Sequence, residues 1–97
     1  MISKYLETRV SLNPNNAIDA EYGIRQPMDL EYYLLENENN TYGIEVVKRE
    51  VVSNYETEMI KNFSGCREAT RNTVGMLAAN RVTPMELMFV LDNMVGV

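Results

Sequence analysis

The fold is decided by residues 28–50, which read MDLEYYLLENENNTYGIEVVKRE. Residues 28–35 alternate between two sets of side chains, Met28, Leu30, Tyr32 and Leu34 against Asp29, Glu31, Tyr33 and Leu35. Successive side chains of a strand point to opposite faces, so this period of two predicts a strand. After the polar stretch ENENN (36–40), alternation resumes over residues 42–49. Two such runs with a short polar connection predict a β-hairpin.

Further strands are predicted on both sides of this hairpin. Upstream, residues 3–12 (SKYLETRVSL) alternate, and their even positions are expected to face the core. Residues 13–27 carry Asn, Pro and Gly without a sustained period, and we interpret them as a long loop. Downstream, Val51, Val52 and Tyr55 are expected to extend the second hairpin strand, and residues 58–63 to return along the sheet.

Helical spacing replaces alternation after residue 63. Ser64 is expected to cap the first helix, which runs to about Asn80 and lays a stripe of small residues on the sheet. This stripe consists of Cys66, Ala69, Thr70, Thr73 and Leu77, flanked by Val74 and Met76.

A second helix is predicted from Pro84 to near Gly96. Thr83 suits the N-cap, Pro84 suits the first helical position, and Glu86 can reach back to the amide of the cap. Its core stripe is predicted as Leu87, Met88, Leu91, Met94 and Val95. We therefore expect one α+β domain over residues 1–97, with an antiparallel sheet of three to four strands followed by two C-terminal helices packed on one face.

Charge disfavours a nucleic-acid partner. The formal net charge is −5, and an acidic chain repels phosphate backbones. The two helices resemble a helix-turn-helix in outline, but residues 84–95 contain no Lys or Arg for base or phosphate contacts. Nucleic-acid binding would require one patch built from Lys61, Arg67, Arg71 and Arg81.

No catalytic, cofactor-binding or metal-ligating residue is predicted. Histidine, the commonest general base and metal ligand, is absent. Cys66 is interpreted as a buried core residue, since cysteine is usually buried and no histidine can pair with it. The acids of 36–40 alternate like calcium ligands, but the Gly and Glu that an EF-hand loop needs are missing. An enzyme is therefore not favoured.

The predicted location is the cytoplasm, without membrane contact. The longest strongly apolar stretch, residues 85–91, is far shorter than a bilayer-spanning helix. A single cysteine cannot build an intramolecular disulfide framework, and no secretory signal opens the chain.

Four residues are candidates for an interaction surface. Met85 and Phe89 lie off the core stripe of the second helix at i, i+4 spacing. Tyr33 and Leu35 lie on the sheet face opposite Leu34, which the helices are not expected to cover. The alternatives are that the first helix or residues 13–27 cover Met85 and Phe89, and that a neighbouring strand or loop covers the other pair.

Three segments, EYYLLEN (31–37), TYGIEVVKRE (41–50) and NRVTPMELMFVLDNMV (80–95), carry a resemblance to a known family. The chain resembles small proteins of clostridia and other Firmicutes that are classed as a domain of unknown function. The resemblance covers about residues 28–97, and 13–27 is interpreted as an addition. It implies a cytoplasmic protein of a Gram-positive bacterium and brings no activity or catalytic residues.

The sequence favours a non-enzymatic protein-interaction or regulatory module, either a homodimer or the binder of another protein. The alternative is a small-ligand-binding protein or minor enzyme. Its pocket would lie between residues 13–27 and the helices, with Tyr22 and Arg25 among the lining residues.

Overall fold

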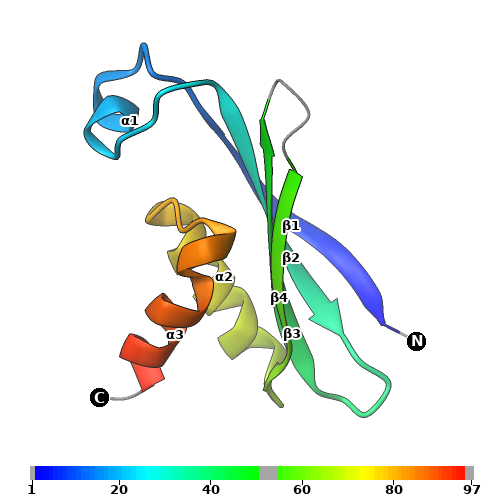
Figure 1. Ribbon diagram of the computed structural model, residues 1–97. Helices are drawn as coiled ribbons and strands as arrows, with labels where there is room; N and C mark the ends of the chain where they lie inside the picture. Colours follow the sequence, from blue (N-terminus) through cyan, green and yellow to red (C-terminus); the bar gives the residue numbers. More distant parts are fainter. Residues whose placement is uncertain (1, 51–54, 96–97) are drawn as a thin grey trace.

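The structure, a computed structural model of the chain, describes residues 2–50 and 55–95 (Figure 1). In chain order its elements are β1 (Ser3–Leu12), α1 (Ala17–Glu21), β2 (Met28–Glu36), β3 (Tyr42–Glu50), β4 (Tyr55–Ser64), α2 (Arg67–Ala79), the 3-10 turn η1 (Pro84–Glu86) and α3 (Leu87–Val95).

The four strands form one antiparallel sheet in the order β1-β2-β3-β4. The predicted hairpin is its centre, with Met28 opposite Glu50 and Glu36 opposite Tyr42. Tyr55 begins β4 instead of extending β3, so that part of the prediction is wrong. Val51 and Val52, which were expected to continue β3, lie outside the described residues.

The pairing of β3 with β4 contains a bulge. Tyr42 is opposite Ser64 while Ile44 is opposite Ile60, so β4 carries extra residues beside Gly43. A Cβ on Gly43 would collide with the backbone carbonyl oxygens of Ile60 and Lys61. Glycine is therefore required at this position because the two backbones approach closely.

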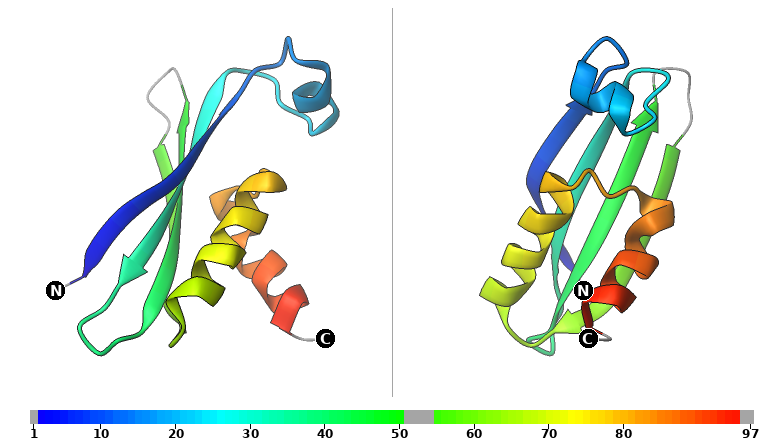
Figure 2. Two further views of the ribbon diagram at one scale, coloured as in Figure 1. Left: turned by 180° about the vertical axis from the view of Figure 1, so that it is seen from behind. Right: turned by 90° about the vertical axis from the view of Figure 1, so that its left-hand side faces the viewer.

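Both C-terminal helices cover the same face of the sheet, as predicted (Figure 2). They are joined by residues 80–83 and bury one apolar core between themselves and the strands. This core contains Leu12, Leu30, Tyr32, Ile44, Val46, Val74, Leu77, Ala78, Val82, Leu87 and Leu91. The α+β architecture predicted from the sequence is confirmed.

The first C-terminal helix begins later than predicted. Ser64 ends β4, and its hydroxyl accepts the amide N–H of Cys66 at 3.0 Å. Cys66 is the N-cap of α2 and is exposed, so its assignment to the core is wrong. The buried residues of α2 are Thr70, Val74, Leu77 and Ala78. The helix is rotated this way because burying Val74 and Ala78 beside Leu77 removes more apolar area from water than burying Cys66 and Thr73 would.

The start of the second C-terminal helix is confirmed. The carboxylate of Glu86 accepts the backbone N–H of Thr83 at 3.0 Å, and Pro84 opens the first turn. Leu87 and Leu91 are buried in the core. Met88 and Met94, predicted for the core, are 48% and 43% exposed, which makes that prediction wrong for both. The short helix buries only the narrow strip of its surface that faces the sheet.

Residues 13–27 contain a helix, which corrects their interpretation as a loop. Asn16 caps α1 by accepting the N–H groups of Ile18 and Asp19 at 2.9 and 3.2 Å. Asp19 is buried and accepts Nε of Arg81 at 3.1 Å, which ties α1 to the connection between α2 and η1. In the sequence, the capping residue Asn16 could not be distinguished from the other Asn residues of this polar segment.

Candidate interaction surface

One buried hydrogen bond fixes where the last helix begins. Tyr32 of β2 is fully buried, and its hydroxyl donates to the carbonyl oxygen of Val82 at 2.8 Å. Burial, together with the nearby carboxylate of Glu86, raises the pKa of Tyr32 well above its ordinary value. The hydroxyl therefore stays protonated and holds the connection before η1 against the centre of the sheet.

An exposed apolar strip runs along the outer side of η1 and α3. Met85 is 84% exposed, Phe89 is 72% exposed and Met88 is 48% exposed. We call these three residues the α3 ridge; their i, i+3, i+4 spacing places them on one side of the helix. Neither α2 nor residues 13–27 cover Met85 and Phe89. Whether a partner does so stays a prediction.

A groove of about 370 Å³ lies beside the ridge, between β4 and η1. Its lining residues are Tyr55, Glu56, Thr57, Glu58, Pro84 and Met85. Lys48 lies 3.2 Å from a carboxylate oxygen of Glu56, while Glu58 is exposed. The groove therefore combines apolar side chains with acidic groups.

The opposite face of the sheet offers less apolar surface than predicted. Leu35 is only 1% exposed and has no accessible side chain for a partner. It lies on the central strand β2, opposite Lys4 of β1 and Gly43 of β3. Tyr33 is half-buried, and the ammonium group of Lys4 lies 4.3 Å from its ring centroid.

Two buried glutamates on this face are neutralised by basic groups. Glu31 accepts hydrogen bonds from Arg9 at 2.8 Å, Arg49 at 2.9 Å and the hydroxyl of Tyr33 at 3.0 Å. Burial alone would raise the pKa of Glu31, but these three hydrogen bonds outweigh it and hold the pKa below its ordinary value. Each group has its partner, so the cluster stabilises the sheet and resembles no acid-base pair poised for catalysis.

The other buried carboxylate belongs to Glu45. It lies 2.8 Å from Nζ of Lys4 and accepts the hydroxyl of Thr57 at 3.0 Å. The hydrogen bond to Glu45 raises the pKa of Lys4. These contacts join β1, β3 and β4 across the exposed face.

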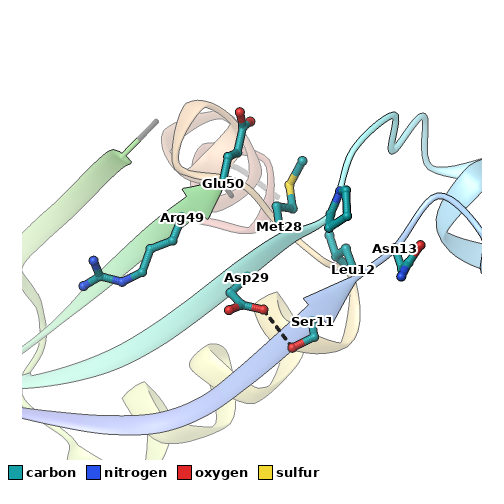
Figure 3. Close-up of a pocket in the computed structure, with 8 residues that line it drawn as sticks. Ser11, Leu12, Asn13, Met28, Asp29, Arg49 and Glu50 are labelled. Carbon is teal, nitrogen blue, oxygen red and sulfur yellow. Dashed lines mark hydrogen bonds between the residues drawn. The ribbon is translucent and has the colours of Figure 1, made fainter. Parts of the chain in front are cut away.

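A cavity of about 270 Å³ lies where residues 13–27 leave and rejoin the sheet (Figure 3). Ser11, Leu12, Asn13, Pro27, Met28, Asp29, Arg49 and Glu50 line it. The Ser11 hydroxyl donates to Asp29 at 2.8 Å, and the Arg49 side chain points away from Leu12 and Asn13. Tyr22 and Arg25, predicted to line a pocket near this segment, do not line this cavity. The Tyr22 ring contacts Arg81 instead.

The arginines proposed for a nucleic-acid patch are partly engaged within the fold. Arg71 lies 2.6 Å from a carboxylate oxygen of Glu7, and Arg81 lies 3.1 Å from that of Asp19. Over residues 2–50 and 55–95, no three His, Cys, Asp or Glu side chains are grouped to hold a metal ion. Within the same part of the chain, no helix is long and apolar enough to cross a membrane.

Comparison with known protein families shows which family this chain belongs to. Residues 11–97 match the family described as "Family of unknown function (DUF6514)". The chain belongs to this family. The predicted resemblance to a family of unknown function is confirmed, and the match begins at residue 11, so it extends beyond the predicted range 28–97 and spans residues 13–27. Neither curated proteins nor solved structures gave a match to this chain.

Proposed function

We propose that this DUF6514 chain is a non-enzymatic protein-interaction or regulatory module whose contact surface is the α3 ridge. The observation that supports this is the exposure of Phe89 in α3, 72%, four residues after Met85 in η1, which is 84% exposed. Large apolar side chains grouped in this way are typical of a surface that another protein covers. Phe and Met are also among the residues enriched at interfaces.

The energetic reason is the apolar area that remains in water. Fully burying one such side chain contributes about 1.5–3 kcal/mol. The sheet cannot supply this burial, because Leu87 and Leu91 already fill the face of α3 that contacts the core. Methionine side chains adapt their shape to a partner, so Met85 and Met88 suit such a contact.

A foreign protein is favoured over a second copy as the occupant. The net charge of −5 makes two copies repel each other. Residues 84–95 contain Glu86 and Asp92 but no Lys or Arg, so a two-fold contact of α3 with itself would bring like charges together. The setting that we propose is the cytoplasm, where reducing conditions keep an exposed free thiol such as Cys66 reduced.

The test places a photo-crosslinking amino acid, p-benzoylphenylalanine, at position 89 in cells that naturally contain the protein. We expect a crosslinked partner from position 89 and none from position 72, an exposed site on α2 that serves as the control. The substitution Phe89→Asp should leave the free energy of unfolding within about 0.5 kcal/mol of wild type and abolish capture of that partner. Asn72→Asp adds the same charge and should leave capture intact.

Two outcomes would count against the proposal. If Phe89→Asp unfolds the chain, Phe89 belongs to the core. If position 89 captures nothing, the ridge is no contact surface in cells. Light scattering over a concentration range separates the homodimer from the foreign partner, because a dimer that Phe89→Asp dissociates would identify a second copy as the occupant.

The second candidate function, binding of a small ligand, rests on the cavity at the base of residues 13–27. Its volume of about 270 Å³ is small for a ligand site, since such pockets typically hold about 300–1,000 Å³. Thermal-shift screening with a metabolite panel tests it. A concentration-dependent rise in melting temperature that Asp29→Asn removes would favour this reading over the interaction module.

A further inference from the structure

β4 forms one edge of the sheet and extends over ten residues, Tyr55–Ser64. Among the described residues, no strand pairs with its outer side. An edge strand presents backbone N–H and C=O groups that another strand can pair with. Tyr55 and Met59 on this strand are 54% and 44% exposed, which leaves apolar side chains beside those backbone groups.

At the other edge of the sheet, formed by β1, a side chain of α2 contacts the strand. At β1, Arg71 of α2 reaches Glu7 at 2.6 Å, so a helix side chain bridges to that edge. At β4, the helix side of the edge is the open groove lined by Glu56, Glu58 and Met85. The groove beside β4 therefore has space for the side chains of an added strand.

The chemistry of the groove specifies what such a strand would carry. Glu56 and Glu58 are two residues apart on β4, so their side chains share the face of the sheet that the groove lies on. Met85 supplies apolar contact on that face. Tyr55 is paired with Arg49 and supplies an exposed apolar side chain on the other face of the same edge. The α3 segment above the groove contributes no Lys or Arg. Lys48 lies 3.2 Å from Glu56, so the exposed Glu58 is the acidic group more open to a basic side chain. Positive charge and apolar side chains are the complement of this surface.

We propose that the β4 edge binds an extended segment of a partner protein in which Lys or Arg alternates with apolar residues. The segment pairs with the backbone of β4 near 55–58. Its basic side chains lie on the helix side of the sheet, beside Met85, and approach Glu56 and Glu58. Its apolar side chains lie on the opposite side of the sheet and contact Tyr55. This inference rests on the proposed function, because it names the partner chemistry for the module whose α3 ridge begins at Met85.

A second copy of the chain is a poorer occupant of this edge. Antiparallel pairing of β4 with its counterpart around Thr57 would set Glu56 opposite Glu58 across the interface. Like charges directly opposite each other on paired strands are destabilising. A basic segment meets attraction at the same two positions, which is why we assign the edge to a foreign strand.

The experiment uses the full ¹⁵N-labelled chain and synthetic ten-residue peptides as probes. In all peptides every second position is Val or Thr. The positions between them are all Lys in the first peptide, all Ser in the second and all Glu in the third. We expect the Lys peptide to shift the backbone amide signals of Tyr55–Glu58 and to bind about fivefold more tightly than the Ser peptide, with no binding of the Glu peptide. A fourth probe, the Lys peptide with alternate backbone amides methylated, should lose binding because it cannot pair as a strand.

Matched variants separate local charge from overall charge. Glu58→Lys should weaken binding of the Lys peptide about fivefold, while Glu21→Lys, an exposed change of the same charge on α1, should leave affinity within about twofold. The proposal is overturned if the Lys peptide shifts no β4 amide at millimolar concentration, if the methylated peptide binds equally well, or if both variants weaken binding to the same extent.

Failure here is distinguishable from failure of the proposed function. Crosslinking from position 89 without any peptide effect at β4 would keep the α3 ridge and overturn the strand inference. Lys-peptide binding at β4 without any crosslink from position 89 would keep the strand inference and remove the ridge as a contact surface.

Discussion

Removing the Tyr32 hydroxyl should destabilise the whole fold and loosen the start of the last helix. In Tyr32→Phe the ring keeps its packing, but the Val82 carbonyl loses the donor that lies 2.8 Å away. Val82 is 4% exposed, so water replaces that donor poorly. Leaving a buried carbonyl unsatisfied costs about 1–3 kcal/mol, and we expect a loss of about 2 kcal/mol in the free energy of unfolding. For a domain of this size that corresponds to a fall in melting temperature of roughly 8–16 °C.

Urea unfolding followed by circular dichroism measures this loss. The midpoint should fall while the slope with urea stays unchanged, since the surface exposed on unfolding is the same. Tyr5→Phe, at a position that is 43% exposed, is the matched control and should change stability by less than about 0.5 kcal/mol. Equal stability of Tyr32→Phe and wild type would refute the reasoning, because the bond would then contribute nothing beyond the packing of the ring.

Two further predictions concern the sheet. Because the folded-state pKa of Glu31 lies below its unfolded value, its contribution to stability is present above about pH 4.3 and is lost as pH falls through the folded pKa. The free energy of unfolding in urea should therefore be measured for wild type and Glu31→Gln at a series of pH values. Below about pH 4.3 the variant should lose less stability per pH unit than wild type. Parallel plots of this free energy against pH would contradict the prediction. Gly43→Ala places a Cβ against the carbonyls of Ile60 and Lys61, and we expect a loss of about 2 kcal/mol or more with shifted amide signals at the bulge. Gly75→Ala, where a Cβ meets open space on α2, is the control and should be neutral or stabilising.

Local chemistry made much of the fold predictable. The central hairpin follows from alternation over 28–50, and the start of the last helix follows from Thr83-Pro84 with Glu86, because both signals act within a few residues. The errors share a different cause. Cys66 and Met88 were assigned to the core from helical spacing, and Cys66 also from the usual burial of cysteine. The sheet contacts a narrower strip of each helix than spacing predicts.

The candidate surface was predictable only in part. The helical wheel placed Met85 and Phe89 away from the core, and both are exposed. Leu35 was placed with them, but it is 1% exposed on a strand that lies between β1 and β3, and that position depends on strand order and not on its own segment. The groove between β4 and η1 had no signal in the sequence, because it joins Glu58 to Met85 across 27 positions of chain.

The sequence by itself determined the elements: the period of two, the proline-led helix start, the acidic charge and the absence of histidine are all properties of neighbouring residues or of composition. The tertiary structure decided which side chains from distant parts of the chain lie next to one another. It buried Glu31 under Arg9 and Arg49, tied α1 to the helices through Asp19 and Arg81, and left an open strand edge beside an exposed methionine. These outcomes depend on strand order and helix placement, which arise from the competition among all apolar surfaces for one shared core.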